Sequence, residues 1–200
     1  MYIPHSYKNE NIEEVKSFLE QNSFGILVNQ VDGKPWATHI PLELDTDANG
    51  KAILVGHISK ANQQWKTFEQ QKEVLCIFNG PHSYISSSWY KEEEVPTWNY
   101  IAVHVSGTIK ILSEEEVLAS MYKLVDKYEK NSTAPISIDS LSPKTMKQIK
   151  GVVGFKIQIK SIEAAYKLSQ GRPEDHPKII DALEKSGDIG SVAIAKEMKK

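Results

Sequence analysis

The stretch FGILVNQVDGKPWATHIPLEL, from Phe24 to Leu44, decides the fold of this chain. It consists of two runs of apolar and β-branched residues on either side of the dipeptide Asp32-Gly33. Aspartate and glycine tolerate the positive φ angles that a two-residue hairpin turn requires. The stretch therefore predicts two consecutive antiparallel strands, so the sheet begins antiparallel.

The rest of the chain supplies further strands and helices. Alternating or continuous apolar runs predict strands, and apolar residues at helical spacing predict helices. Gly107 is expected to mark a bulge or corner in its strand, and Ser113 with Glu116 forms a capping box at the start of a helix. The predicted strands lie at 52–58, 73–80, 83–90, 99–112 and 152–169. The predicted helices lie within 9–25, 59–71, 113–130 and 144–151, with two more in the tail around a break at 187–190.

These elements predict an α+β fold, because hairpin-linked strands outnumber the helices between them. The expected architecture is a closed or half-closed antiparallel barrel with peripheral helices. A chain of 200 residues is long enough for one well-packed domain with an appendage. We expect a barrel domain at 1–170 and a helical appendage, packed on the barrel, at 171–200.

Composition is that of a folded, water-soluble protein. Charged residues make up 25% and hydrophobic residues 40% of the chain, and the formal charge is -2. This balance excludes wholesale disorder and any global field that would draw the protein to nucleic acid or to an anionic membrane. The start of the chain has no leader pattern and no run spans a bilayer, so we expect a cytoplasmic protein. Cys76, in VLCIF, is expected to be a buried structural thiol.

The junction GHISKANQQW suggests an anion site. His57 ends a predicted strand, Asn62 caps the next predicted helix, and Lys60 adds a positive charge between them. Unpaired amides at a helix start attract phosphate groups. The plainer interpretation is an ordinary capped helix with a solvated lysine, and spacing alone favours it.

Three further features are candidates for ligand contact. Trp98, Asn99 and Tyr100 stand side by side after a proline, and aromatic side chains with polar tips favour an interface or a ligand wall. His39 lies on the second hairpin strand, where a partly buried imidazole is the plainer interpretation. Arg172 is the only arginine, and its planar fork suits a phosphate or carboxylate; pairing with a nearby Glu174 or Asp175 is an equal alternative.

Several functions are disfavoured. No metal-ligand spacing connects the histidines, so no metal site is expected. The serines of SSSWY lack the context of a nucleophile. The tail resembles a helix-turn-helix in outline, but its charges nearly cancel, so charge supports direct DNA contact only weakly. The scattered histidines are His5, His39, His57, His82, His104 and His176.

Taken together, the ordered motifs resemble a known family. The segments MYIP, THIPL, GHISKANQQW, FNGPHSYISSSWY, VPTWNYIAVHVSG, GVVGFKIQI and KLSQGR run nearly from end to end and are similar to the PaiB family of FMN-binding split-barrel regulators. The resemblance implies a homodimeric split barrel, FMN as cofactor, and negative regulation of degradative-enzyme synthesis and sporulation.

The resemblance also implies a set of cofactor-binding residues. Thr38 and His39 would lie beside the flavin ring, and His57, Lys60 and Asn62 would approach its phosphate end. Four residues, some from a second subunit, would close the site: Trp89, Trp98, Asn99 and Tyr100. Arg172 completes the set of cofactor-binding candidates. Two departures weaken the expectation of tight binding, because the family's usual RANP and SPSWY stand here as KANQ and SSSWY.

Two alternative functions stay open. One is an FMN-dependent oxidoreductase or flavin reductase that uses NAD(P)H; no catalytic residue stands out, although His39 or His57 would serve as an acid or base. The other is a binding module for haem or another planar ligand, suggested by the histidines and aromatic residues. The connector at 91–97 is a candidate lid over a ligand.

Overall fold

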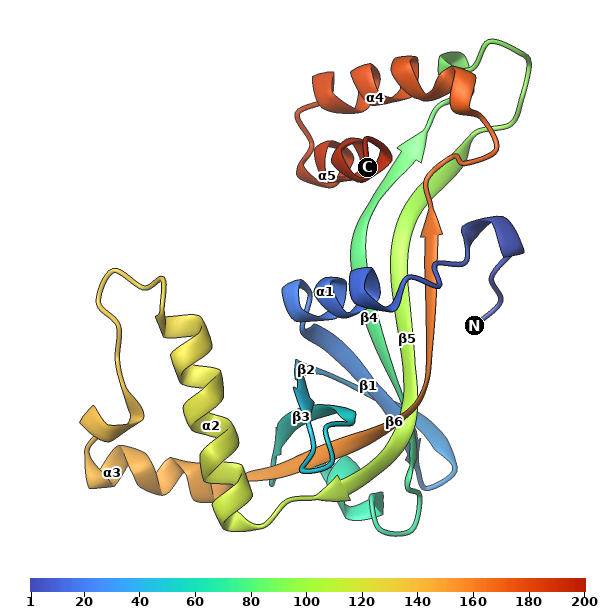
Figure 1. Ribbon diagram of the computed structural model, residues 1–200. Coiled ribbons are helices and arrows are strands. Elements are labelled where there is room, and N and C mark those ends of the chain that lie inside the picture. The colour runs from blue at the N-terminus through green and yellow to red at the C-terminus, as the bar shows by residue number, and fades with distance from the viewer. The chain divides into compact units, whose positions relative to one another are not determined.

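The computed structural model describes residues 1–200. Six strands close an antiparallel barrel in the order β1-β2-β3-β6-β5-β4 (Figure 1), which confirms the predicted α+β barrel. The strands are β1 (Phe24–Val31), β2 (Lys34–Thr46), β3 (Ala52–Ser59), β4 (Glu73–Ile85), β5 (Thr97–Ile111) and β6 (Val152–Lys167). The helices are α1 (Ile12–Gln21), α2 (Glu114–Glu129), α3 (Pro143–Met146), α4 (His176–Lys185) and α5 (Ile189–Met198), and the short 3₁₀ helices include η2 (Gln63–Thr67), η3 (Ser87–Trp89) and η5 (Lys147–Gly151).

The hairpin forms as the sequence predicts. Asp32 and Gly33 have φ angles of 52° and 73°, and β1 pairs with β2 in a register that places Val31 opposite Lys34. The capping box of α2 is confirmed as well, because Ser113 and Glu116 each accept a hydrogen bond from the other's backbone amide.

The chain divides into two compact units. The barrel unit comprises Leu19–Ile77 and Val105–Ile162, and the tail unit comprises Met1–Phe18, Phe78–His104 and Glu163–Lys200. Strands β4, β5 and β6 contribute residues to both units. The expected barrel domain at 1–170 and helical appendage at 171–200 stay predictions.

Each unit has its own core. In the barrel unit the rings of Phe68 and Phe155 meet edge to face with centroids 5.6 Å apart, and Cys76 is fully buried, as predicted. Burial raises the pKa of the Cys76 thiol to about 12, so this thiol stays protonated and unreactive. In the tail unit α4 and α5 pack together through Ile179, Leu183, Ile194, Ala195 and Met198.

Two predictions about elements are wrong in detail. The segment 59–71 forms only the short 3₁₀ helix η2, because the buried Gln64 side chain fixes this turn against β1. The segment 83–90 is not a separate strand: β4 continues to Ile85, and η3 follows. β5 is one strand through Gly107, where the absence of a side chain lets β6 approach closely. The bulge or corner expected at Gly107 stays a prediction.

Candidate functional site

A chain of polar side chains joins η2 to the barrel. The Thr38 hydroxyl accepts a hydrogen bond from the Asn62 amide at 2.9 Å and donates one to Gln64 Oε1 at 2.5 Å. Gln64 is fully buried and also donates to the Leu27 carbonyl and to Asn29 Oδ1. Asn62 caps η2 as predicted, since its Oδ1 accepts from the Gln64 amide at 3.0 Å. The polar atoms of Thr38 and Asn62 therefore fix the loop that precedes η2.

That loop presents Lys60. The Lys60 backbone amide donates to the Gly151 carbonyl and its carbonyl accepts from the Trp65 indole, each at 2.9 Å. The side chain is exposed, and its ammonium group has no hydrogen bond or ion pair. A fixed backbone with an unpaired cation is suited to binding an anionic group.

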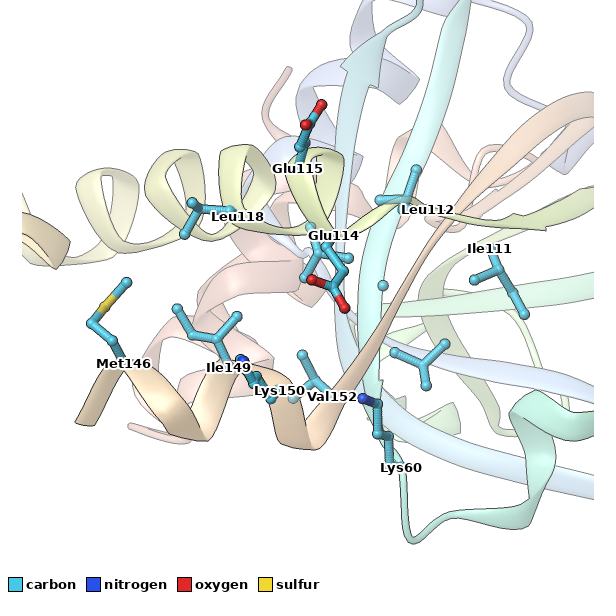
Figure 2. Close-up of a pocket in the computed structure, with 13 residues that line it drawn as sticks. Lys60, Ile111, Leu112, Glu114, Glu115, Leu118, Met146, Ile149, Lys150 and Val152 are labelled. Atoms are coloured by element: carbon cyan, nitrogen blue, oxygen red, sulfur yellow. The ribbon is translucent and has the colours of Figure 1, made fainter. Parts of the chain in front are cut away.

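Lys60 also lines a pocket of the barrel unit with a volume of about 490 Å³ (Figure 2). The pocket lies between the first turn of α2, the segment α3–η5 and the start of β6. Its walls are mainly aliphatic, with charged groups at Lys60, Lys150, Glu114 and Glu115. This pocket was not predictable from the sequence, because its walls come from both ends of the long connection between β5 and β6, and Lys60 comes from the distant loop before η2.

His57 lies elsewhere on the barrel unit. It is half-buried and lines a smaller cavity of about 150 Å³ together with Glu43, Asp45, Lys123 and Lys127. Burial lowers the pKa of its imidazole, because desolvation disfavours the charged form. His39 is exposed on β2. The structure thus places His57 and Lys60 in different cavities.

The other predicted residues belong to the tail unit. Trp98 is 53% exposed and Tyr84 is 47% exposed, and their rings meet edge to face with centroids 6.0 Å apart. The His82 ring lies 6.1 Å from that of Trp98. Tyr100 is half-buried. Trp98 is therefore exposed beside a second aromatic ring, and the interface or ligand wall expected at this place stays a prediction.

Asn99 and Trp89 have structural contacts instead. Asn99 is fully buried, and its amide group exchanges hydrogen bonds with the Ser169 hydroxyl at 3.0 and 3.1 Å. Trp89 packs against the core formed by α4 and α5. Contact of either side chain with a cofactor stays a prediction.

Arg172 holds the connector at 91–97. It forms an ion pair with Glu94, and its guanidinium lies 4.6 Å from the centre of the Tyr90 ring. A second carboxylate, that of Asp175, lies 3.9 Å away. The predicted pairing with Asp175 is confirmed, and Glu94 is a partner that the sequence analysis did not identify.

No cluster of three or more histidine, cysteine, aspartate or glutamate residues is arranged to hold a metal ion. None of the helices combines the length and apolar composition that a membrane-spanning helix needs.

Comparison with known proteins adds a family and a fold. A family model described as "Putative FMN-binding domain" matches residues 1–161. Protease synthase and sporulation protein PAI 2 of Bacillus subtilis (strain 168) is 44% identical over 201 residues, covering 100% of this chain and 97% of that protein.

Two solved structures share the fold at low sequence identity. The flavocytochrome Anf3 from Azotobacter vinelandii matches with a TM-score of 0.64 and 18% identity, covering 81% of this chain and 70% of that one. The FAD- and haem-binding protein from Mycobacterium smegmatis matches with a TM-score of 0.62 and 14% identity, covering 80% and 73%.

Proposed function

The chain belongs to the family of FMN-binding domains that includes PAI 2 of Bacillus subtilis, and from this membership we propose that it is a PaiB-like, flavin-binding regulator of protease synthesis and sporulation. The barrel is the cofactor-binding part in this proposal. The family model covers β1 to β5 and most of β6, and it leaves out α4 and α5.

The observation that carries the proposal is the unpaired Lys60 ammonium on a fixed loop. FMN combines an apolar ring system with hydroxyl groups and a phosphate, and Lys60 supplies the cation for the phosphate. The hydrogen bonds of Thr38 and Asn62 are satisfied within the protein, so these residues position the loop that carries Lys60. Thr38 and Asn62 are therefore positioning residues, which hold Lys60 in place without touching the flavin.

The second part of the proposal is a homodimer. Tyr84, Trp98, Ile189 and Val192 are exposed apolar side chains of the tail unit, and Ile189 is 87% exposed. Exposed apolar and aromatic side chains of this kind are typical of protein interfaces. We assign this surface to a second copy of the chain, whose Trp98 would close the flavin site over Lys60.

Flavin binding is tested by titrating the purified, cofactor-free chain into FMN while flavin fluorescence is followed. The proposal expects saturable quenching at micromolar protein. Absence of quenching at high micromolar concentrations would contradict it. Steady consumption of NAD(P)H in the presence of FMN would instead support an oxidoreductase, and a Soret band on titration with haemin would support a haem-binding module.

Regulation is tested separately in Bacillus subtilis that lacks PAI 2. Expression of this chain is expected to lower secreted casein-degrading activity, and PAI 2 expressed from the same promoter is the comparison. If PAI 2 lowers the activity and this chain does not, the regulatory part of the proposal is wrong. If this chain does lower the activity, salt-sensitive binding to promoter DNA would distinguish direct action from action through a protein partner.

A further inference from the structure

The segment 143–152 of the barrel unit repeats a three-residue pattern. Within its sequence, PKTMKQIKGV, three successive triplets each place a lysine first, a polar residue or glycine second and an apolar residue third. The structure forms α3 and then the 3₁₀ helix η5 over this segment. A 3₁₀ helix has three residues per turn, so residues three apart in the chain lie in one row along the helix. The triplets therefore form a lysine row, a polar row and an apolar row.

The apolar row faces α2. Met146, Ile149 and Val152 all line the pocket between α2 and η5, and Figure 2 shows Met146 and Ile149 pointing toward α2. Glu114 of α2 points into the same space. Because the apolar row is packed on that side, the lysine row and the polar row are each turned away from it by roughly 120°.

The lysine row is exposed and carries a charge that the protein does not neutralise. Lys144, Lys147 and Lys150 form no ion pair and no hydrogen bond through their ammonium groups. Lys150 also borders the pocket, whereas Lys144 and Lys147 do not. The stretch 140–162, which contains the row, has five lysines and no aspartate or glutamate. The chain as a whole has a formal charge of -2, so this stretch concentrates positive charge in one place.

The tail helices differ from this segment, because most of their lysines are paired. Lys185 forms an ion pair with Asp181 at 2.7 Å, and Lys199 forms one with Glu184 at 2.6 Å. No other helix of the chain carries three unpaired lysines. The segment α3–η5 is therefore better suited to a polyanion than the tail is.

The length of the lysine row fits a series of phosphate groups. From Lys144 to Lys150 the helix advances about 10 Å along its axis. The phosphates of one DNA strand follow one another at intervals of about 3.4 Å along the duplex axis, so the row lies alongside about three of them. Thr145 and Gln148, in the neighbouring polar row, add hydroxyl and amide donors, which also contact phosphate oxygens in protein–DNA complexes.

We propose that the lysine row of α3–η5 binds the phosphate backbone of double-stranded DNA. The choice of DNA rests on the regulatory part of the proposed function, and the row supplies the contact that direct regulation needs. An anionic membrane fits less well, because the apolar row that would enter the bilayer is turned toward α2. Lys60 has no part in this site, so the flavin phosphate and the DNA phosphates are bound by different lysines.

Fluorescence anisotropy of the full chain with a labelled duplex of about 20 base pairs tests the proposal. Three phosphate contacts contribute about -2.7 to the slope of log K against log salt concentration. The association constant of the wild type is therefore expected to fall at least roughly fortyfold between about 50 mM and about 200 mM salt.

A triple variant locates the binding. The row variant, with Lys144→Gln, Lys147→Gln and Lys150→Gln, is expected to lose about 2.7 units of the salt slope and to bind at least roughly tenfold more weakly at about 50 mM salt. The matched control changes the net charge equally and should bind nearly as wild type does. It replaces by glutamine three exposed, unpaired lysines scattered over the barrel unit: Lys34, Lys51 and Lys110.

Three results would overturn the proposal. One is absence of DNA binding by the wild type at the lower salt concentration. Another is an equal loss in the row variant and the control, which would assign the effect to net charge alone. The third is binding of phosphatidylglycerol vesicles that the row variant loses while its DNA binding is unchanged, because the row would then be a membrane contact.

The row variant keeps Lys60, so its FMN titration is expected to match that of the wild type, and far-UV circular dichroism checks that it is folded. Loss of FMN binding by the folded variant would assign the row to the flavin site and overturn the proposal. The casein assay separates this inference from the proposed function. A wild type that lowers casein degradation without binding DNA contradicts only the inference, and one that binds DNA through the row without lowering casein degradation contradicts only the regulatory function.

Discussion

In the barrel unit, the pKa of a single histidine side chain shows the effect of burial. His57 is half-buried on β3, and desolvation lowers the pKa of its imidazole below the ordinary 6.5. The groups that line the same cavity are of both signs: Glu43, Asp45, Lys123 and Lys127. Burial is the cause of the shift, so His57 is predominantly neutral at neutral pH.

This shift predicts how stability depends on pH. The unfolded chain binds a proton on His57 more readily than the folded chain does, so this contribution to stability is fully present above 6.5 and is lost as the pH falls through the lower folded value. Urea unfolding above and below pH 6.5 should show that His57→Gln loses less stability on acidification than wild type does.

The exposed His39 provides the control, and His39→Gln should lose as much stability as wild type. Burial also lowers the pKa of His104, so His104 contributes to the pH dependence of stability in every one of these proteins. The test is therefore the difference in stability loss between the variants and wild type. An identical loss in His57→Gln and wild type would show that His57 is not protonated differently in the two states.

For single side chains, the sequence predicts which residue caps a helix better than it predicts which distant residues a buried side chain contacts. Asn62 was predictable as a cap because the residue type and its place before the predicted helix suffice. The role of Gln64 was not, because its partners Leu27 and Asn29 lie on β1, more than thirty residues earlier. Spacing does not reveal which distant strand a buried amide will meet.

At the level of elements, the closeness of β5 and β6 depends on Gly107. A Cβ atom there would come within 2.7 Å of Ile157 Cγ2 and would collide with the Gln158 carbonyl oxygen of β6. Backbone cannot move aside as a flexible side chain can. An isolated glycine in a strand marks a bulge, a corner or a close backbone approach, and the sequence pattern does not distinguish these. The structure shows the close approach, and the bulge or corner stays a prediction.

We therefore expect Gly107→Ala to lower the free energy of unfolding by roughly 1–3 kcal/mol, the usual cost of overpacking. Chemical denaturation measures this change. Gly151→Ala is the control, because nothing lies within 4 Å of its added Cβ, and it should change stability by less than about 0.5 kcal/mol. Equal stability of the two variants would contradict the close approach of β6 at Gly107.

In the molecule as a whole, the predicted site residues fall into two groups. Thr38, His39, His57, Lys60 and Asn62 belong to the barrel unit, and Trp89, Trp98, Asn99, Tyr100 and Arg172 belong to the tail unit. The sequence predicted the barrel from its hairpins, but not this division. Strands β4, β5 and β6 contribute to both units, and no turn signal marks where they pass from one to the other.

The proposed dimer makes a specific prediction about mixed subunits. If Lys60 of one subunit and Trp98 of the other form each site, Lys60→Ala and Trp98→Ala should both bind FMN weakly. Mixed and allowed to exchange subunits, the two variants should regain part of the binding, because one site of each mixed dimer is intact. If both residues come from the same subunit, mixing will restore nothing.

The central claim, that Lys60 binds the flavin phosphate, is tested most directly by FMN titrations of wild type, Lys60→Ala and Lys66→Ala, followed by flavin fluorescence. Lys66 is exposed in η2 and also unpaired, so it matches Lys60 in charge and differs in place. The account predicts that Lys60→Ala weakens FMN binding at least roughly tenfold, while Lys66→Ala binds as wild type. Saturable FMN binding of equal strength in all three proteins would contradict it.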